Sequence, residues 1–290
     1  MANSMHYDPA LNPFDPTARG LHPNNALWLA AAGNLAYESE KAIQKTTRQW
    51  GFDRCQFLHV STEMGTGGSV FPVDTQAFVC ASHRATLIAF RGTEPLNVKD
   101  WFTDLMIGAV YAPAGLGKVH QGFDTAYRVI QSPLRQLLSD WKVEGNPIWI
   151  AGHSLGGALA VLAGVDLTLN RKLPVQGVYT FGQPRVGDRT FARSVKKTLG
   201  DRLVRFVNNQ DLVPQVPTPG MLLSYWHPVP ETRFDRDGNL VEKPGWRTRL
   251  GLEKGRVKTP LPKLGIEAFT DHSMDRYIER VRRLGEGKPG

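Results

Sequence analysis

Residues 148–162 read Ile-Trp-Ile-Ala-Gly-His-Ser-Leu-Gly-Gly-Ala-Leu-Ala-Val-Leu, and this stretch decides the fold. Its first four residues are apolar and predict a buried strand, and its last six predict a helix that follows at once. The turn between them has the pattern G-x-S-x-G, which holds a serine on a strained turn with its hydroxyl exposed. Gly152 and Gly156 lack the side chains that would keep the strand and the helix apart. The stretch therefore predicts that Ser154 is a nucleophile.

Strands and helices are predicted to alternate on both sides of this turn. Predicted strands cover 56–60, 76–81, 86–90, 147–151, 175–181 and 203–207, and predicted helices cover 123–138, 156–169, 189–199 and 274–284. An amphipathic helix is also expected from Asn24 or Asn25, as N-cap, to Gly51. This alternation favours an α/β fold with a mostly parallel sheet and helices on both faces. We expect one domain over residues 1–290, with an irregular lead-in over residues 1–23.

The composition excludes several classes of protein. The chain has 290 residues, of which 41% are hydrophobic and 21% are charged, as in ordinary globular domains and unlike disordered or collagen-like chains. Its two cysteines, Cys55 and Cys80, are too few for a disulfide framework and have no zinc-site spacing with histidine. We expect two inert buried thiols, and a single bridge between them stays open.

The charge is unevenly distributed along the chain. The formal net charge is +8, and residues 243–263 contain seven basic residues and one acidic residue. This basic stretch fits either a solvated face or attraction to an anionic lipid surface. No nucleic-acid partner is expected, because no helix-turn-helix, zinc-finger or RNA-binding signature is present.

No transmembrane segment or signal peptide is expected. The longest uncharged stretch, residues 21–37, contains a proline, a histidine and three asparagines, which is atypical of a bilayer helix. The first eighteen residues contain two aspartates and no lysine or arginine, unlike a secretory leader. The localisation stays open between the cytoplasm, export by a route without a signal, and removal of a leader.

A serine hydroxyl needs a base to remove its proton and a carboxylate to orient that base. In α/β-hydrolase sheets these residues follow in the order serine, acid, histidine. Six of the eight histidines precede Ser154, which leaves His227 and His272. His227 leads into a predicted edge strand over 229–234, whereas His272 lies in a loop before the closing helix. We therefore favour His272 as the base.

The acid should lie in a loop that leaves a strand near the serine. Asp211 follows the predicted strand over 203–207 and fits this position. Asp235 and Asp237 surround a hairpin-turn signal, and Asp271 is expected at the start of the closing helix. We therefore predict a triad of Ser154, Asp211 and His272, which requires no metal and no organic cofactor.

Several blocks of the sequence together resemble the class 3 (fungal-type) lipases of the α/β-hydrolase superfamily. The blocks are Phe-Arg-Gly-Thr at 90–93, Val-His-Gln-Gly-Phe at 119–123, the turn and helix start at 152–160, Phe-Gly-Gln-Pro-Arg-Val-Gly-Asp at 181–188, Asp-Leu-Val-Pro at 211–214 and Asp-His at 271–272. The resemblance spans about 200 residues, from 76 to 277. It places the family's triad on Ser154, Asp211 and His272.

The resemblance also implies an oxyanion hole and a lid. The oxyanion donors would be the backbone N–H of Leu155 and the N–H and hydroxyl of Thr93. Residues 94–107 would form a short amphipathic lid helix that covers the serine in water and opens at an oil surface. The lid and substrate-binding residues would be Leu96, Trp101, Phe102 and Leu105.

The activity implied is that of a serine ester hydrolase, and of a triacylglycerol lipase in particular. Phospholipase A1 and feruloyl or short-chain carboxylesterase activities use the same triad and remain alternatives. A non-catalytic lipid-binding module is an alternative from another class, but it predicts a degraded triad. The expected partners are a lipid or ester substrate and a lipid interface, contacted transiently through the lid and the basic C-terminal region. The secretory leader and disulfides of fungal members are not expected here.

Overall fold

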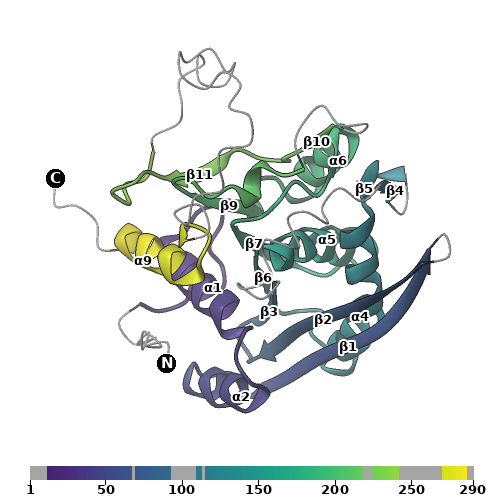
Figure 1. Cartoon of the computed structure of the whole chain (residues 1–290). Helices are drawn as coiled ribbons and strands as arrows, with labels where there is room; N and C mark the ends of the chain where they lie inside the picture. The colour runs from purple at the N-terminus through teal and green to yellow at the C-terminus, as the bar shows by residue number, and fades with distance from the viewer. Residues whose placement is uncertain are drawn as a thin grey trace.

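A seven-stranded sheet in the order β1-β2-β3-β6-β7-β9-β11 runs through the centre of the molecule (Figure 1). The computed structural model describes residues 12–66, 69–92, 109–112, 115–217, 224–241 and 270–285. The strands are β1 (Arg54–Thr66), β2 (Ser69–Ala81), β3 (Thr86–Phe90), β6 (Ile148–His153), β7 (Val175–Phe181), β9 (Leu203–Asn208) and β11 (Glu231–Phe234). From β3 to β11 all neighbours are parallel, and only β1 and β2 join in antiparallel fashion. The predicted α/β class with a mostly parallel sheet is confirmed.

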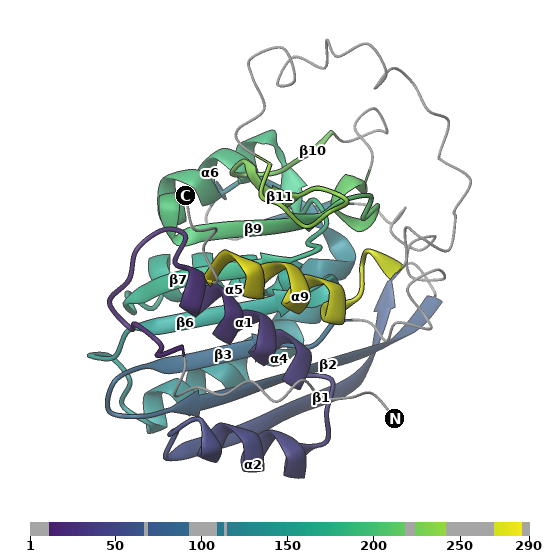
Figure 2. The same ribbon diagram turned by 90° about the vertical axis from the view of Figure 1, so that its left-hand side faces the viewer.

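Helices cover both faces of this sheet. The first face carries α1 (Pro23–Leu35) and α9 (Met274–Gly285), which lie side by side in front of the strands in Figure 2. The opposite face carries α4 (Gln121–Asp140) and α5 (Leu155–Leu169), and α6 (Arg189–Leu199) packs beside α5. At the far edge, α2 (Glu40–Gln49) packs against β1. Crossover helices of this kind bury a parallel sheet on both sides.

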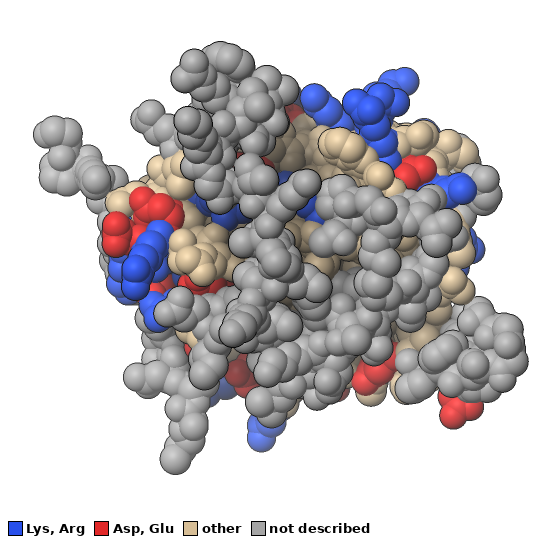
Figure 3. Space-filling model, turned by 45° about the horizontal axis from the view of Figure 1, so that its top comes forward, with Lys and Arg blue, Asp and Glu red and all other residues tan. Residues whose placement is uncertain are grey.

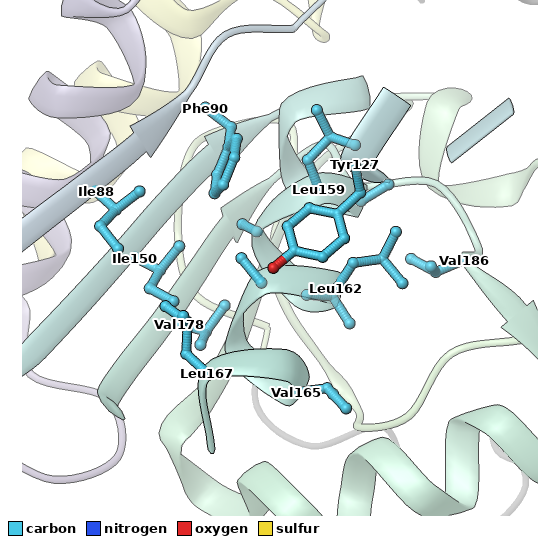
Figure 4. Packing of buried hydrophobic residues seen from close by; sticks show 14 of the residues in the cluster. Ile88, Phe90, Tyr127, Ile150, Leu159, Leu162, Val165, Leu167, Val178 and Val186 are labelled. Carbon is cyan, nitrogen blue, oxygen red and sulfur yellow. The ribbon is translucent and has the colours of Figure 1, made fainter. Parts of the chain in front are cut away.

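The core has one hydrophobic cluster on each face of the sheet. Along β6, Ile148 and Ile150 belong to the cluster under α4 and α5, whereas Trp149 and Ala151 belong to the cluster under α1 and α9. Figure 4 shows the first cluster, with the side chain of Ile150 among those of neighbouring strands and helices. Side chains alternate between the faces of a strand, so a continuous apolar run fills both clusters. This burial fixes the strand that ends at the predicted nucleophile.

The prediction of one amphipathic helix over residues 24–51 is wrong. The chain forms two helices, and it breaks between them because Ser39 caps a new one: its side chain accepts a hydrogen bond from the Ala42 amide. The first helix is capped by His22, with Pro23 at its first position, and not by either asparagine. Asn25 instead lies buried inside α1, where its amide side chain binds the backbone of Asp15.

Helix α1 is buried on nearly all sides. Residues from Asn25 to Leu35 are almost all inaccessible because the sheet covers one side and α9 packs against another. A helix that is apolar all round belongs in a core, which explains why its pattern misled the amphipathic prediction. None of the described helices is long and apolar enough to cross a membrane.

A second, smaller sheet in the order β10-β8-β5-β4 was not predicted. Its strands are β10 (Tyr225–Trp226), β8 (Gly187–Asp188), β5 (Lys118–His120) and β4 (Ala109–Tyr111), and all of its pairs are antiparallel. Strands of two or three residues carry too little alternation to be recognised from a sequence.

The two cysteines face each other on neighbouring strands. Cys55 on β1 and Cys80 on β2 are direct partners in the antiparallel register, and both are free thiols. Burial raises the pKa of each thiol, and most strongly that of Cys80. Cys80 is buried as predicted, whereas Cys55 is only partly buried, and a raised pKa favours the protonated, less reactive thiol in both.

Candidate active site

Ser154 lies at the tight turn between β6 and α5. Its backbone has φ 55° and ψ −126°, a strained conformation for a residue with a side chain. The turn is held in place because the Ser154 amide donates to the Phe181 carbonyl at 3.0 Å and the Ser154 carbonyl accepts from the Gly157 amide at 2.9 Å. This geometry places the hydroxyl at the N-terminus of α5, where free amides and the helix dipole favour negative charge.

The glycines on either side of the serine are required by close backbone contacts. A Cβ added to Gly152 would lie 2.1 Å from the backbone oxygen of Gly156. A Cβ added to Gly156 would lie 2.3 Å from the backbone oxygen of Phe90 on β3. Since real Cβ atoms do not approach other atoms so closely, the spacing of G-x-S-x-G is dictated by the strand-helix crossing itself.

Asp211 and His272 form a buried hydrogen-bonded pair. The His272 Nδ1 atom lies 2.9 Å from Asp211 Oδ2 and 3.1 Å from Oδ1. Asp211 is fully buried and His272 is 3% exposed, although 61 positions separate them in the chain. A carboxylate can only accept here, so Nδ1 carries a proton and Nε2 is the atom of the neutral ring that has a lone pair.

Two further donors hold the Asp211 carboxylate. The Tyr277 hydroxyl donates to Oδ2 at 2.6 Å, and the Val213 amide donates to Oδ1 at 2.9 Å. The Tyr277 oxygen in turn accepts from the Asn208 amide at 3.1 Å. Burial and the neighbouring Asp211 charge raise the pKa of Tyr277 well above its usual value, so it remains a donor. Tyr277 was not predicted as part of the site; it lies in the closing helix α9, one turn beyond the histidine.

Ser154 and His272 are not hydrogen-bonded to each other in the structure, so the Asp211–His272 contact is the formed part of the predicted triad. Ser154 Oγ and His272 Nε2 are both buried, and neither has a hydrogen-bond partner among the described residues. The His272 ring also lies against the ring of His153, the residue before the serine, with ring centroids 4.4 Å apart. The structure thus brings His272 to the turn that carries Ser154.

His153 binds the backbone of His272. Its Nε2 atom lies 2.6 Å from the His272 carbonyl oxygen, and its Nδ1 atom lies 2.8 Å from the Tyr37 hydroxyl. A carbonyl oxygen can only accept, so Nε2 donates and Nδ1 accepts from Tyr37. Burial, and secondarily the nearby His272, lowers the pKa of His153 well below its usual range, which keeps the ring neutral. Sequence reasoning set His153 aside because it precedes the serine, and it gave Tyr37 no role.

Gly182 permits the close approach of the acid and the base. It follows β7 with φ +60°, and a Cβ there would lie 2.7 Å from both Asp211 Oδ2 and His272 Nδ1. Only glycine meets both conditions, the left-handed backbone and the absence of a side chain. Its place in the Phe-Gly-Gln-Pro block, just after a buried strand, was the one signal that could have identified it.

Two of the rejected candidates, His227 and Asp271, have other partners. His227 Nε2 lies 2.7 Å from the Pro214 carbonyl. Asp271 does not start α9 as predicted, because the helix begins three positions later at Met274. Its carboxylate instead accepts from the Asn209 side chain at 3.0 Å and the Gln210 amide at 3.2 Å. Asp271 thereby ties the loop of the acid to the loop of the base.

Part of the predicted site lies outside the described residues. This holds for Thr93, for the lid and substrate-binding residues Leu96, Trp101, Phe102 and Leu105, and for the basic stretch over 243–263. Leu155 is described and is the first residue of α5. The first amides of a helix have no hydrogen-bond partner within the helix, as an oxyanion donor at Leu155 requires, and the role itself stays a prediction.

Comparison with known proteins agrees with this geometry. Residues 87–221 match the family model "Lipase (class 3)". The triacylglycerol lipase OBL1 of Arabidopsis thaliana is 30% identical over 87% of this chain and 63% of its own length. A lipase of Rhizomucor miehei is 37% identical over 50% of this chain and 41% of its own length. The solved structure of the Rhizomucor miehei triacylglyceride lipase superposes with a TM-score of 0.57 at 26% identity, covering 74% of this chain and 80% of that one.

The parallel sheet, the strained serine turn and the buried acid-base pair define an α/β-hydrolase. Within that superfamily, the chain is similar to the class 3 lipases, whose family model matches residues 87–221. It spans less than two thirds of the length of these curated relatives.

Proposed function

We propose that the protein is a serine ester hydrolase, and specifically a triacylglycerol lipase that cleaves acylglycerol esters through an acyl-enzyme on Ser154. One observation carries the proposal: the buried Asp211–His272 pair lies against the turn that carries Ser154, with His272 Nε2 unpartnered among the described residues. The lipase names of the relatives from Arabidopsis thaliana and Rhizomucor miehei support this choice of substrate.

The first half of the reaction acylates the serine. Ser154 Oγ attacks the ester carbonyl carbon while His272 Nε2 takes the hydroxyl proton. Asp211 keeps Nδ1 protonated and stabilises the imidazolium that forms. The tetrahedral intermediate then collapses, the bond to the alcohol oxygen breaks, and His272 returns its proton to the departing alcohol.

The second half releases the fatty acid. A water molecule gives a proton to His272 Nε2 and attacks the acyl carbon, and Ser154 leaves as its hydroxyl when that proton returns. Negative charge develops on the carbonyl oxygen in both halves. We assign its stabilisation to the amides of Leu155 and Thr93, because one preset donor contributes about 3 kcal/mol to such a transition state.

The lipid interface is the expected partner of this site. Opening of the lid helix over 94–107 would place Leu96, Trp101, Phe102 and Leu105 on lipid, and the basic stretch over 243–263 would add attraction to an anionic surface. No metal or organic cofactor takes part in the proposed reaction. Phospholipase A1 and feruloyl or short-chain carboxylesterase activities are the competing substrate choices.

A chain-length series of p-nitrophenyl esters and triglyceride emulsions tests the proposal, run beside Ser154→Ala. The substitution should remove turnover on every substrate, by on the order of a millionfold, while circular dichroism shows an intact fold. Turnover that survives in Ser154→Ala would exclude the mechanism. A rate jump as tributyrin passes its solubility limit supports a lipase, whereas smooth saturation favours an esterase.

A further inference from the structure

One helix carries only positive charge on its exposed face. Helix α6 has four basic residues and no acidic residue between Arg189 and Leu199. The cations are Arg189, Arg193, Lys196 and Lys197, and all four are exposed. No acidic side chain among the described residues forms an ion pair with any of them. The spacing of three to four residues lines them up along one side of the helix.

An exposed tryptophan extends this row of charges. Trp226 on β10 is 44% exposed, and the Arg189 guanidinium lies 5.2 Å from the centre of its ring. β10 pairs with β8, the short strand that leads directly into α6, so the contact is fixed by the small sheet. Figure 3 shows a group of Lys and Arg side chains at its upper right, on the side where Figure 1 places α6. We call Trp226 and the four cations the α6 face.

The α6 face begins at the catalytic edge of the molecule. β7 ends at the edge where Gly182 contacts the acid and the base, and α6 starts shortly afterwards and runs back toward the start of β9. Arg189 and Trp226 are therefore at the end of the face nearest to the site. From Arg189 to Lys197 the helix rises about 12 Å, enough to contact several headgroups at once.

We propose that the α6 face docks the protein on anionic lipid surfaces, which would hold the catalytic edge near its substrate. This rests on the proposed lipase function. Exposed Lys and Arg side chains are attracted to an anionic leaflet, and tryptophan prefers the boundary between headgroups and acyl chains. The tryptophan favours a lipid partner over a nucleic acid, for which phosphate contacts from cations would suffice.

The test is co-sedimentation with sucrose-loaded vesicles, made of phosphatidylcholine alone or of an equimolar mixture with phosphatidylglycerol. Measuring it in a Ser154→Ala background keeps binding independent of turnover. The variant Arg193→Gln, Lys196→Gln, Lys197→Gln should lose at least about tenfold in partition onto the anionic vesicles, since each cation near the surface contributes about fivefold. Trp226→Ala should lower partition as well.

Helix α2 offers a matched control. Its exposed cations Lys41, Lys45 and Arg48 have a similar spacing, but α2 lies at the other edge of the sheet (Figure 1). The variant Lys41→Gln, Lys45→Gln, Arg48→Gln removes the same charge and should stay within about twofold of the parent in partition. Both triple variants should fold normally and, with Ser154 restored, hydrolyse a soluble ester at the parent rate.

Three outcomes would overturn the proposal. The first is an equal loss in both triple variants, which would assign binding to net charge alone. The second is equal binding to both kinds of vesicle. The third is that the α6 variant binds duplex DNA more weakly than the parent, as measured by fluorescence anisotropy, while its vesicle binding is unchanged. If the protein binds vesicles as predicted but cleaves no ester, the lipase function is rejected and the docking surface stands.

Discussion

The imidazole of His153 holds the backbone of His272, with 2.6 Å between Nε2 of the first and the carbonyl oxygen of the second. His153, the residue before the proposed nucleophile, thereby fixes the position of His272, the proposed base. Serine and histidine come from distant parts of the chain, and this contact links their two loops directly. A second contact, from the Tyr37 hydroxyl at 2.8 Å, fixes the tautomer that makes it possible.

Replacing His153 should therefore slow the chemical step. In His153→Phe the ring remains but the donor to the His272 carbonyl is lost, so the base is held less firmly. We expect kcat on a soluble p-nitrophenyl ester to fall by on the order of tenfold to a hundredfold, with KM within about twofold, because small misplacements of catalytic groups are costly. Tyr37→Phe keeps that donor and should lose less. An unchanged kcat in His153→Phe would show that the contact does not position the base.

A methyl group added at Gly182 should prevent Asp211 and His272 from forming their hydrogen bond. Gly182→Ala would bring a Cβ to 2.7 Å from Asp211 Oδ2, whereas Gly200, which has a similar φ of +58°, has open space around it. Both alanine variants should lose about 1 to 2 kcal/mol in unfolding free energy from backbone strain. Ester hydrolysis should be lost in Gly182→Ala alone. Equal activity in the two variants would contradict the crowding seen in the structure.

The hydroxyl of Tyr277 should contribute stability as well as orientation. Tyr277→Phe removes the 2.6 Å bond to Asp211 and should lower the unfolding free energy by about 2 kcal/mol, as measured by urea denaturation. Tyr127→Phe is the matched control, because its buried hydroxyl donates to Asp166 at 2.7 Å, away from the site. The control should be destabilised similarly and keep full activity, while Tyr277→Phe should lose activity. Asp211→Asn should lose far more, on the order of 10⁴-fold in kcat.

The protein should become less stable as the pH falls below about 6.5. Burial lowers the pKa of both His153 and His227 in the folded state. The unfolded chain therefore binds up to two more protons than the folded chain below that pH, and stability falls with acidification. Each histidine contributes a slope of up to about 1.4 kcal/mol per pH unit.

Urea unfolding between about pH 7.5 and 5.5 measures this slope. The variant His227→Gln removes one of the two histidines whose pKa is lowered and should show about half the slope of the parent. An unfolding free energy that stays flat across this range would mean that neither histidine is held neutral. Restricting the range to these values keeps the carboxylates, which titrate lower, out of the measurement.

The elements that surround the serine could be predicted because their apolar runs are long and continuous. The predicted bounds of β3, β7 and α6 agree with the structure residue for residue. The pairing of Asp211 with His272 could be predicted because chain order excluded most other candidates and because each residue follows or precedes a clear element. These are local signals combined with one topological rule.

The remainder depends on contacts between distant residues. Tyr37, His153 and Tyr277 acquire their roles only when α1, the serine turn and α9 meet, and no pattern along the chain marks them. The break between α1 and α2 escaped notice because one short capping residue competes with a long helical pattern. The small antiparallel sheet is defined by hydrogen bonds between strands too short to show a period.

The packing of α9 against α1 has a consequence for synthesis on the ribosome. Position 272 follows the nucleophile by 118 residues, and the helix that secures it docks on the first helix of the fold. A nascent chain can form the serine turn long before it possesses a base or the tyrosine that steadies the acid. Under the proposed mechanism, the base is in place only after translation has passed α9, and a polypeptide released before that point should not cleave esters.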